Sequence, residues 1–211
     1  MTVPMDLIEE HFAAGGRTPK GRRARRAIFA ATRALVAERG LELTSLEAIA
    51  NGAGLSQAAL RHYFPTRDEL LTAFFVAATR WFRTQVSNLL TAQDVPARVK
   101  LERAIAWHLE YMEHVDTVFW LEASVYWIRR PQPRQIRDDF YRWLANQYAQ
   151  LIRAVKPELS AKASRGRGYT VLTLVLGAWI THGRGSAVRG AGTPLEQRQL
   201  LIATAMGIIT A

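Results

Sequence analysis

The segment TSLEAIANGAGLSQAALRHYFPTRDEL, from Thr44 to Leu70, decides the fold of this chain. Thr44 with Glu47, and Thr66 with Glu69, have the spacing of a capping box. In a capping box, a hydroxyl and a carboxylate three residues later bind backbone amides that are otherwise unpaired at a helix start. Two helix starts are therefore predicted, one at Thr44 and one at Thr66.

A sharp corner is predicted between two short helices inside this segment. Leu46, Ile49 and Ala50 give the first short helix an apolar face. Gly54 can adopt the positive φ that reverses the chain, and Ser56 can cap the second short helix. Two short helices around such a corner, followed by a long third helix, are typical of a helix-turn-helix, whose second helix enters the major groove of DNA.

The rest of the sequence predicts helices and no strands. Apolar residues recur at helical spacing, and prolines, glycines and hydroxyl residues mark the ends. We expect further helices over Gly21–Arg39, Thr66–Leu90, Pro96–His114, Asp116–Arg129, Arg134–Val155, Ser160–His182 and from Thr193 onwards. With the two short helices, this makes about nine helices and an all-α fold.

The chain is strongly basic, and the positive charge is concentrated around the helix-turn-helix. The net charge is +10. Positions 17–67 carry 10 basic and 3 acidic residues, or +7, whereas positions 68–211 carry 18 and 12, or +6. Such a charge favours a polyanionic partner, and an anionic membrane surface would satisfy it as well as nucleic acid. The location of the charge favours DNA.

Composition also indicates in which cellular compartment the protein is expected. The chain has no cysteine, which excludes disulfides and thiol chemistry. The N-terminal residues carry acid and no continuous apolar core, so no secretory signal is expected. The longest apolar run, residues 171–180, is far shorter than the roughly 20 residues of a membrane-spanning helix. We therefore expect a soluble cytoplasmic protein with no membrane partner.

The stretch LSQAALRHYFPTRDELL resembles the signature of the tetracycline-repressor (TetR) family around its recognition helix, and the resemblance covers about residues 24–71. The chain departs from that signature at Ala58 and Ala59, where the family usually has Gly and then Thr or Ser, and at Arg61, where it usually has Tyr. These positions face the major groove in the family, so its base preference is not carried over.

The resemblance implies a homodimeric transcriptional regulator, most often a repressor, that binds a palindromic operator in double-stranded DNA and is released by a small-molecule effector. We accordingly expect a flexible basic N-terminal arm over residues 1–20. A three-helix DNA-binding domain would follow over 21–66, and a larger helical ligand-binding and dimerisation domain over 67–211.

Candidate DNA contacts come mainly from the second short helix and from the basic segment RTPKGRRARR, residues 17–26, which runs into the first long helix. Gln57 can bind adenine and Arg61 can bind guanine, each pair giving about 1–3 kcal/mol of discrimination. Arg61 could equally bind a phosphate, and the basic segment could be a solvated tail. By resemblance, Tyr63 and Arg67 match positions that hold phosphates. The full set is Arg22, Arg23, Arg25, Ser45, Ser56, Gln57, Ala58, Ala59, Arg61, His62, Tyr63 and Arg67, of which His62, like Phe64, also fits a packing role.

All six tryptophans follow the helix-turn-helix. Aromatic residues line most ligand pockets but also fill most cores, so each tryptophan taken alone fits a core position better. Together they favour an effector that is apolar, aromatic or cationic. Residues 118–148 are loosely similar to the C-terminal part of the choline-responsive BetI-like branch of the family. The candidate ligand contacts are Trp81, Trp107, Tyr111, Trp120, Tyr126, Trp127, Trp143 and Trp179.

The last two predicted helices are apolar nearly all round, which favours burial on more than one side. We expect them to form a dimer interface, with a buried monomer core as the alternative. The candidate interface residues are Leu172, Leu176, Trp179, Ile180, Leu201, Ala205 and Ile208.

Enzyme signatures are missing from the sequence. No two of the five histidines are spaced i, i+4 for metal binding on one helix face, and no phosphate loop, dinucleotide fingerprint or GxSxG motif occurs. We expect no catalytic residue, no metal and no cofactor. The alternative to an effector-controlled regulator is a charge-driven, non-specific DNA or membrane-surface binder without effector control.

Overall fold

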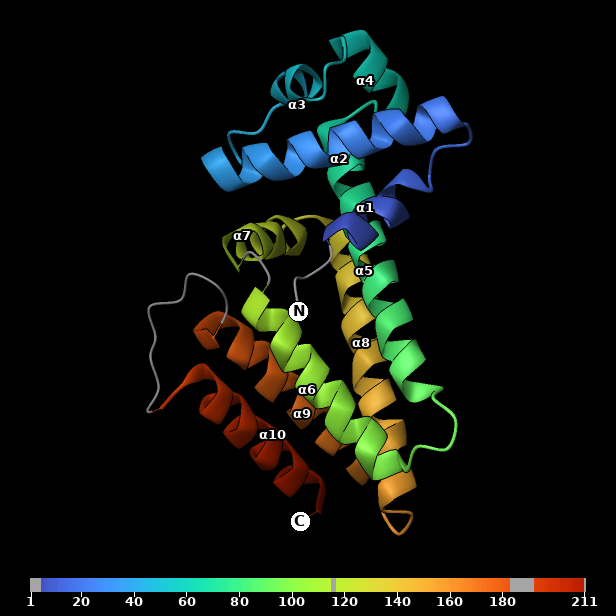
Figure 1. Cartoon of the computed structure of the whole chain (residues 1–211), viewed down its shortest axis with the longest axis vertical. Coiled ribbons are helices and arrows are strands. Elements are labelled where there is room, and N and C mark those ends of the chain that lie inside the picture. The colour runs from blue at the N-terminus through green and yellow to red at the C-terminus, as the bar shows by residue number, and fades with distance from the viewer. Residues whose placement is uncertain (1–4, 115–116, 183–191, 211) are drawn as a thin grey trace. The chain divides into compact units, whose positions relative to one another are not determined.

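The computed structural model describes residues 5–114, 117–182 and 192–210. These ranges contain ten α-helices and no strand (Figure 1). The helices are α1 Met5–Ala13, α2 Pro19–Arg39, α3 Leu46–Gly52, α4 Gln57–Tyr63, α5 Arg67–Leu90, α6 Ala97–His114, α7 Thr117–Ile128, α8 Pro131–Val155, α9 Ala161–His182 and α10 Pro194–Thr210. The prediction of an all-α fold is confirmed, and the helix beyond the expected nine is α1.

Side-chain caps fix the starts of several helices as the sequence predicts. The hydroxyl oxygen of Ser56 accepts the Ala59 amide at 3.1 Å and starts α4. The hydroxyl oxygen of Thr66 accepts the Glu69 amide, also at 3.1 Å, directly before α5. Each bond satisfies one of the amides that a helix start leaves unpaired.

The predicted cap at Thr44 is wrong by one residue. The cap of α3 is Ser45, whose hydroxyl oxygen accepts the Ala48 amide at 3.1 Å. Thr44 is instead buried, and its hydroxyl donates to the carbonyl of Gly40 at 2.8 Å. Adjacent hydroxyl residues offer equivalent capping spacings in sequence, and burial of one of them decides between them.

The chain divides into two compact units, which do not follow the expected boundary at residue 66. Among the described residues, the head unit combines positions 5–84 with Val118–Ile136, and the bundle unit combines positions 85–114 and 117 with positions 137–182 and 192–210. Helices α5 and α8 each contribute residues to both units. The head unit therefore contains α7 in addition to the helix-turn-helix.

An aromatic core holds the head unit together. Phe12 of α1 lies 5.4 Å from Phe29 and 5.4 Å from Phe64 between ring centroids, and Phe29 stacks on Phe74 at 4.5 Å. We predicted a flexible arm over residues 1–20, but residues 5–13 form α1, and Ile8 and Phe12 are completely or almost completely buried. The i, i+4 spacing of these two residues is a helical stripe that the adjoining acidic residues obscure in the sequence.

Helices α6, α8, α9 and α10 form the bundle unit. Leu101 and Ile105 of α6, Val175 of α9 and Ile209 of α10 have no exposed surface. α9 approaches α8 so closely at Gly168 that an added Cβ would lie 2.7 Å from the carbonyl oxygen of Ala145. Within the described ranges, no helix is both long and apolar enough to cross a membrane.

Candidate nucleic-acid interface

The corner between α3 and α4 is rigid because both helices are anchored in the head core. Gly54 has φ +66°, as predicted, and the Leu55 amide donates to the carbonyl of Ala50 at 2.9 Å across the turn. Ile49 and Leu60 have no exposed surface. These anchors fix the face that α4 turns to solvent.

The solvent face of α4 carries the side chains predicted to read bases. Gln57, Ala58, Arg61 and His62 are exposed, whereas Leu60 between them points into the core. No hydrogen bond within the described chain is recorded for the Gln57 or Arg61 side chain. An amide and a guanidinium on one exposed helix face are suited to bidentate contacts with base edges in a major groove.

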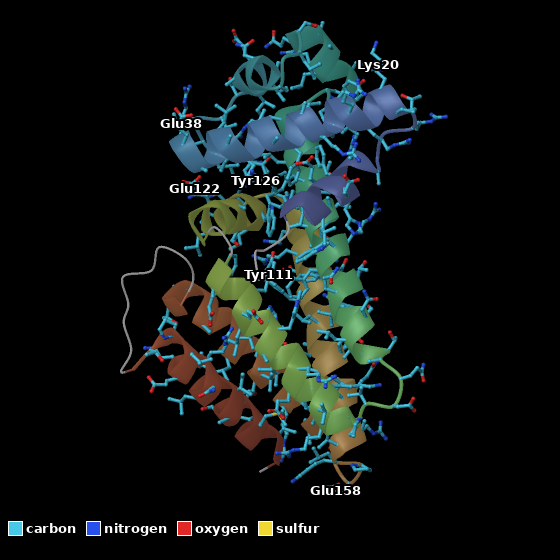
Figure 2. All side chains as sticks on the ribbon, in the orientation of Figure 1. Lys20, Glu38, Tyr111, Glu122, Tyr126 and Glu158 are labelled. Carbon is cyan, nitrogen blue, oxygen red and sulfur yellow. The ribbon has the colours of Figure 1, made fainter. Side chains whose placement is uncertain are left out.

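The N-terminal end of α2 lies next to the C-terminal end of α4. The Tyr63 ring comes within 3.9 Å of the position that a Cβ of Gly21 would occupy. Thr18 caps α2 by accepting the Gly21 amide at 3.0 Å, and Pro19 follows in the first turn. Lys20, labelled in Figure 2, is exposed there, and so is Arg23. A helix N-terminus with exposed cations favours phosphate.

Arg25 is half-buried against the head core, although it is among the DNA contacts predicted from the sequence. Its Nε donates to the carbonyl of Phe12 at 2.8 Å, and its guanidinium lies 4.7 Å from the centroid of the Phe12 ring and 4.6 Å from that of Phe64. Burial lowers the pKa of Arg25. Arg22, also a candidate, is partly buried and donates to the Gly16 carbonyl at 3.3 Å.

Arg67 is likewise engaged within the chain. Its Nε donates to the carbonyl of Thr44 at 2.7 Å, and one terminal nitrogen donates to the carbonyl of Leu41. The hydroxyls of Ser45 and Ser56 serve as helix caps. The polar groups of these three candidates are therefore already bonded to backbone groups of the head unit. They stabilise the positions of α3, α4 and the preceding turn.

The predicted aromatic set is divided between the two units. Trp81, Tyr126 and Trp127 belong to the head unit, while Trp107, Tyr111, Trp143 and Trp179 belong to the bundle unit. The side chain of Trp120 lies outside the described residues. In the bundle unit, Trp107 stacks on Tyr111 with centroids 5.6 Å apart, and His108 Nδ1 lies 3.0 Å from the Tyr148 hydroxyl.

The residues predicted to form the dimer interface differ in their exposure to solvent. Leu172 and Ala205 are covered by the chain's own helices, with 3% and 0% of their surface exposed. Ile180 is 59% exposed, and Leu176, Trp179, Leu201 and Ile208 are partly exposed. The exposed residues Tyr169, Thr173 and Gly177 continue the Ile180 face of α9, and Leu200, Ala203, Thr204 and Gly207 form such a face on α10.

Two hollows lie within the head unit. One of about 570 Å³ is bordered by α1, α5 and the start of α8, with charges of both signs from Arg25, Arg80, Asp68 and Glu69. The other, of about 750 Å³, lies between the α2–α3 turn and α7. Across the described ranges, no group of three or more histidine or acidic side chains could hold a metal ion.

Sequence comparison identifies the family of this helix-turn-helix. The profile of bacterial regulatory proteins of the tetR family matches residues 28–74, from within α2 to within α5. Residues 28–74 of this chain therefore carry a helix-turn-helix of the TetR type. Over 47 residues the chain is 55% identical to the HTH-type transcriptional regulator PksA of Bacillus subtilis, a match that covers 22% of this chain and 23% of PksA. The match thus spans less than a quarter of the length of that relative.

Solved structures share the fold over nearly the whole chain. A TetR-family transcriptional regulator from Streptomyces coelicolor gives a TM-score of 0.75 at 16% identity, over 93% of this chain and 92% of that one. A protein from Saccharomonospora viridis, described as a transcriptional regulator in complex with choline, gives 0.66 at 22% identity, over 87% and 95%. At these identities the likeness concerns the fold alone.

Proposed function

We propose that this chain is a DNA-binding transcriptional regulator that reads a specific duplex sequence with α4. The observation that carries the proposal is the exposed face of α4, where Gln57 and Arg61 project from a helix whose opposite side is locked by Leu60. The family match over residues 28–74 supports it, because that range contains the whole corner. Gln57 is assigned to adenine and Arg61 to guanine or to a phosphate.

Exposed cations on α2 would bind DNA phosphates and so position α4 in the groove. Such contacts do not depend on the base sequence. Lys20 and Arg23 are exposed beside Tyr63, at a helix N-terminus whose dipole favours phosphate. Phosphate contacts fix the register of a protein on DNA, and base contacts supply the specificity. Arg25 and Arg67 are left out of the proposed contact set, because the head core already uses their guanidinium groups.

The proposed assembly is a homodimer on a palindromic operator, with the exposed faces of α9 and α10 as its interface. Ile180 and Leu200 are 59% and 68% exposed, and nothing lies within 4 Å of a Cβ added at Gly177 or Gly207. The exposed residues of these two faces are uncharged, which is typical of a surface that packs against a partner. Two copies of α4 would then have to lie about 34–36 Å apart to enter successive major grooves.

Repression with release by a small effector is the proposed mode of control. The bundle unit offers stacked Trp107 and Tyr111, and the buried indole N–H of Trp179 has no hydrogen-bond partner among the described residues. Choline, the ligand of the Saccharomonospora viridis protein, is a quaternary ammonium ion, and aromatic faces bind such ions. The proposed effector is therefore a flat apolar molecule or an organic cation.

Selection of bound sequences from random duplex DNA at near-physiological salt tests the proposal. An enriched inverted repeat, preferred by roughly 10³-fold or more over random DNA, is the expected result. A charge-driven binder, favoured as the alternative by the +10 net charge, would show a steep salt dependence and no enriched sequence. Arg61→Ala separates base from phosphate contact: loss of preference at one base position indicates base reading, and equal weakening on all sequences indicates phosphate binding.

A further inference from the structure

The turn that joins α2 to α3, residues 40–45, sets where α3 begins. Gly40 closes α2 by donating its amide to the Val36 carbonyl at 2.9 Å, and Ser45 caps α3. Between them, Leu43 is 75% exposed and anchors nothing, whereas Leu41 is 3% exposed. The turn is therefore held by the buried Leu41 side chain, by Thr44, which bonds to the Gly40 carbonyl, and by the groups that bond to the Leu41 backbone.

Two side chains from distant parts of the sequence hold the Leu41 residue from opposite sides. The Leu41 amide donates to the carboxylate of Glu122, which lies 81 residues later on α7. The Leu41 carbonyl accepts from Arg67, the first residue of α5, and Arg67 also donates to the Thr44 carbonyl. Both bonds involve a charged side chain, which makes them stronger than bonds between neutral groups.

Gly40 makes room for the carboxylate. A Cβ at this position would lie 3.0 and 3.2 Å from the two carboxylate oxygens of Glu122. Gly40 also has φ +79°, a conformation that residues with a side chain rarely adopt. The turn is thus shaped for a close approach of the Glu122 carboxylate to the backbone.

Glu122 is the only charged residue in α7, whose sequence is TVFWLEASVYWI. One turn later, the Tyr126 hydroxyl donates to Asp68 in the first turn of α5. The Arg67 guanidinium lies 5.7 Å from the centroid of the Tyr126 ring. Figure 2 labels Glu122 and Tyr126 on α7, near the C-terminal end of α2 marked by Glu38. Glu122 is therefore directed at the α2–α3 turn, and Tyr126 at the start of α5.

We propose that Glu122 is a positioning residue for DNA binding, which holds the α2–α3 turn so that α3 and α4 keep the orientation required at the major groove. Any movement of α7 that withdraws the carboxylate frees the Leu41 amide and loosens the start of α3. The Glu122–Leu41 bond then couples α7 to the start of α3. The effect of Glu122 on operator affinity rests on the proposed function. Its stabilisation of the α2–α3 turn does not.

Three variants of the full chain test this. Glu122→Ala removes the acceptor, Glu122→Gln retains a neutral one, and Glu42→Ala removes an exposed carboxylate from the same turn. Hydrogen exchange of the Leu41 amide in the absence of DNA measures the hold on the turn. Fluorescence anisotropy with the selected operator duplex measures affinity.

Loss of a hydrogen bond to a charged group should raise the Leu41 exchange rate and weaken operator binding by about tenfold or more in Glu122→Ala. Glu122→Gln should lie between this variant and the wild type, and Glu42→Ala should change neither exchange nor affinity by such a factor. Removing a negative charge alone should slightly strengthen binding to DNA, so weakening is opposite in sign to a charge effect.

Unchanged exchange in Glu122→Ala would overturn the hold on the turn. Faster exchange with wild-type operator affinity would overturn the positioning role. If the wild-type protein selects no DNA sequence, the proposed function fails and the positioning role fails with it, but the exchange comparison still decides whether Glu122 holds the turn.

Discussion

Acidification should destabilise this protein through His108 well before its carboxylates are protonated. His108 lies in the bundle core with 2% of its surface exposed, and its Nδ1 is 3.0 Å from the Tyr148 hydroxyl. Burial lowers the pKa of His108 from 6.5 to about 3. The folded state therefore keeps this ring neutral at pH values where the unfolded chain protonates it.

The sign and size of the effect follow from linkage. Between pH 6.5 and about 3 the unfolded chain binds a proton that the folded chain does not, so the free energy of unfolding falls as the pH falls. At pH 7.5, about one unit above the unfolded pKa of 6.5, the contribution is almost complete. Taking these two pKa values, the loss from pH 7.5 to pH 5 is about 2 kcal/mol, since one pKa unit corresponds to about 1.4 kcal/mol.

Urea unfolding at pH 7.5 and pH 5, at a fixed protein concentration, measures the effect in wild type and in His108→Gln. Glutamine does not titrate and can still bond to Tyr148, so we expect the variant to lose about 2 kcal/mol less than the wild type between the two pH values. His62→Gln, at an exposed histidine on α4, is the matched control and should behave as the wild type does. Equal losses in wild type and His108→Gln would refute the reasoning.

Three further predictions concern the head core, the arginines and the assembly. Phe12→Ala, which opens a cavity among stacked rings, should lower the free energy of unfolding by about 3–5 kcal/mol in chemical denaturation; a change under about 1 kcal/mol would show that α1 adds little to the core. Arg25→Ala should lower that free energy by about 1–3 kcal/mol, because a hydrogen bond and ring contacts are lost. Arg23→Ala should leave stability intact and reduce the salt dependence of DNA binding by about one phosphate contact, and the reverse pattern would contradict both assignments. Ile180→Glu with Leu200→Glu should yield a monomer in analytical ultracentrifugation where the wild type is a dimer, and an unchanged mass would exclude these faces as the interface.

Local sequence signals determined the helical framework and the exposed face of α4. The Ser56 and Thr66 caps and the positive φ of Gly54 are interactions within three or four residues, so spacing alone predicts them. Spacing alone could not predict that Ser45, and not Thr44, caps α3, because both hydroxyls fit the pattern. Thr44 is buried and bonds to the Gly40 carbonyl, which leaves Ser45 as the cap.

Tertiary structure decided which charged residues remain available to a partner. Arg25 bonds to the backbone 13 residues away, Arg67 to a backbone 23 residues away, and Glu122 to one 81 residues away. In the sequence the two arginines are indistinguishable from exposed cations such as Arg23, and Glu122 is a lone acid in an apolar helix. Composition and helical period determine that a side chain is charged and on which face of its helix it lies. Only the packing of helices distant in sequence determines whether a backbone group meets it there, because the sequence pattern carries local spacing but not the contacts between those helices.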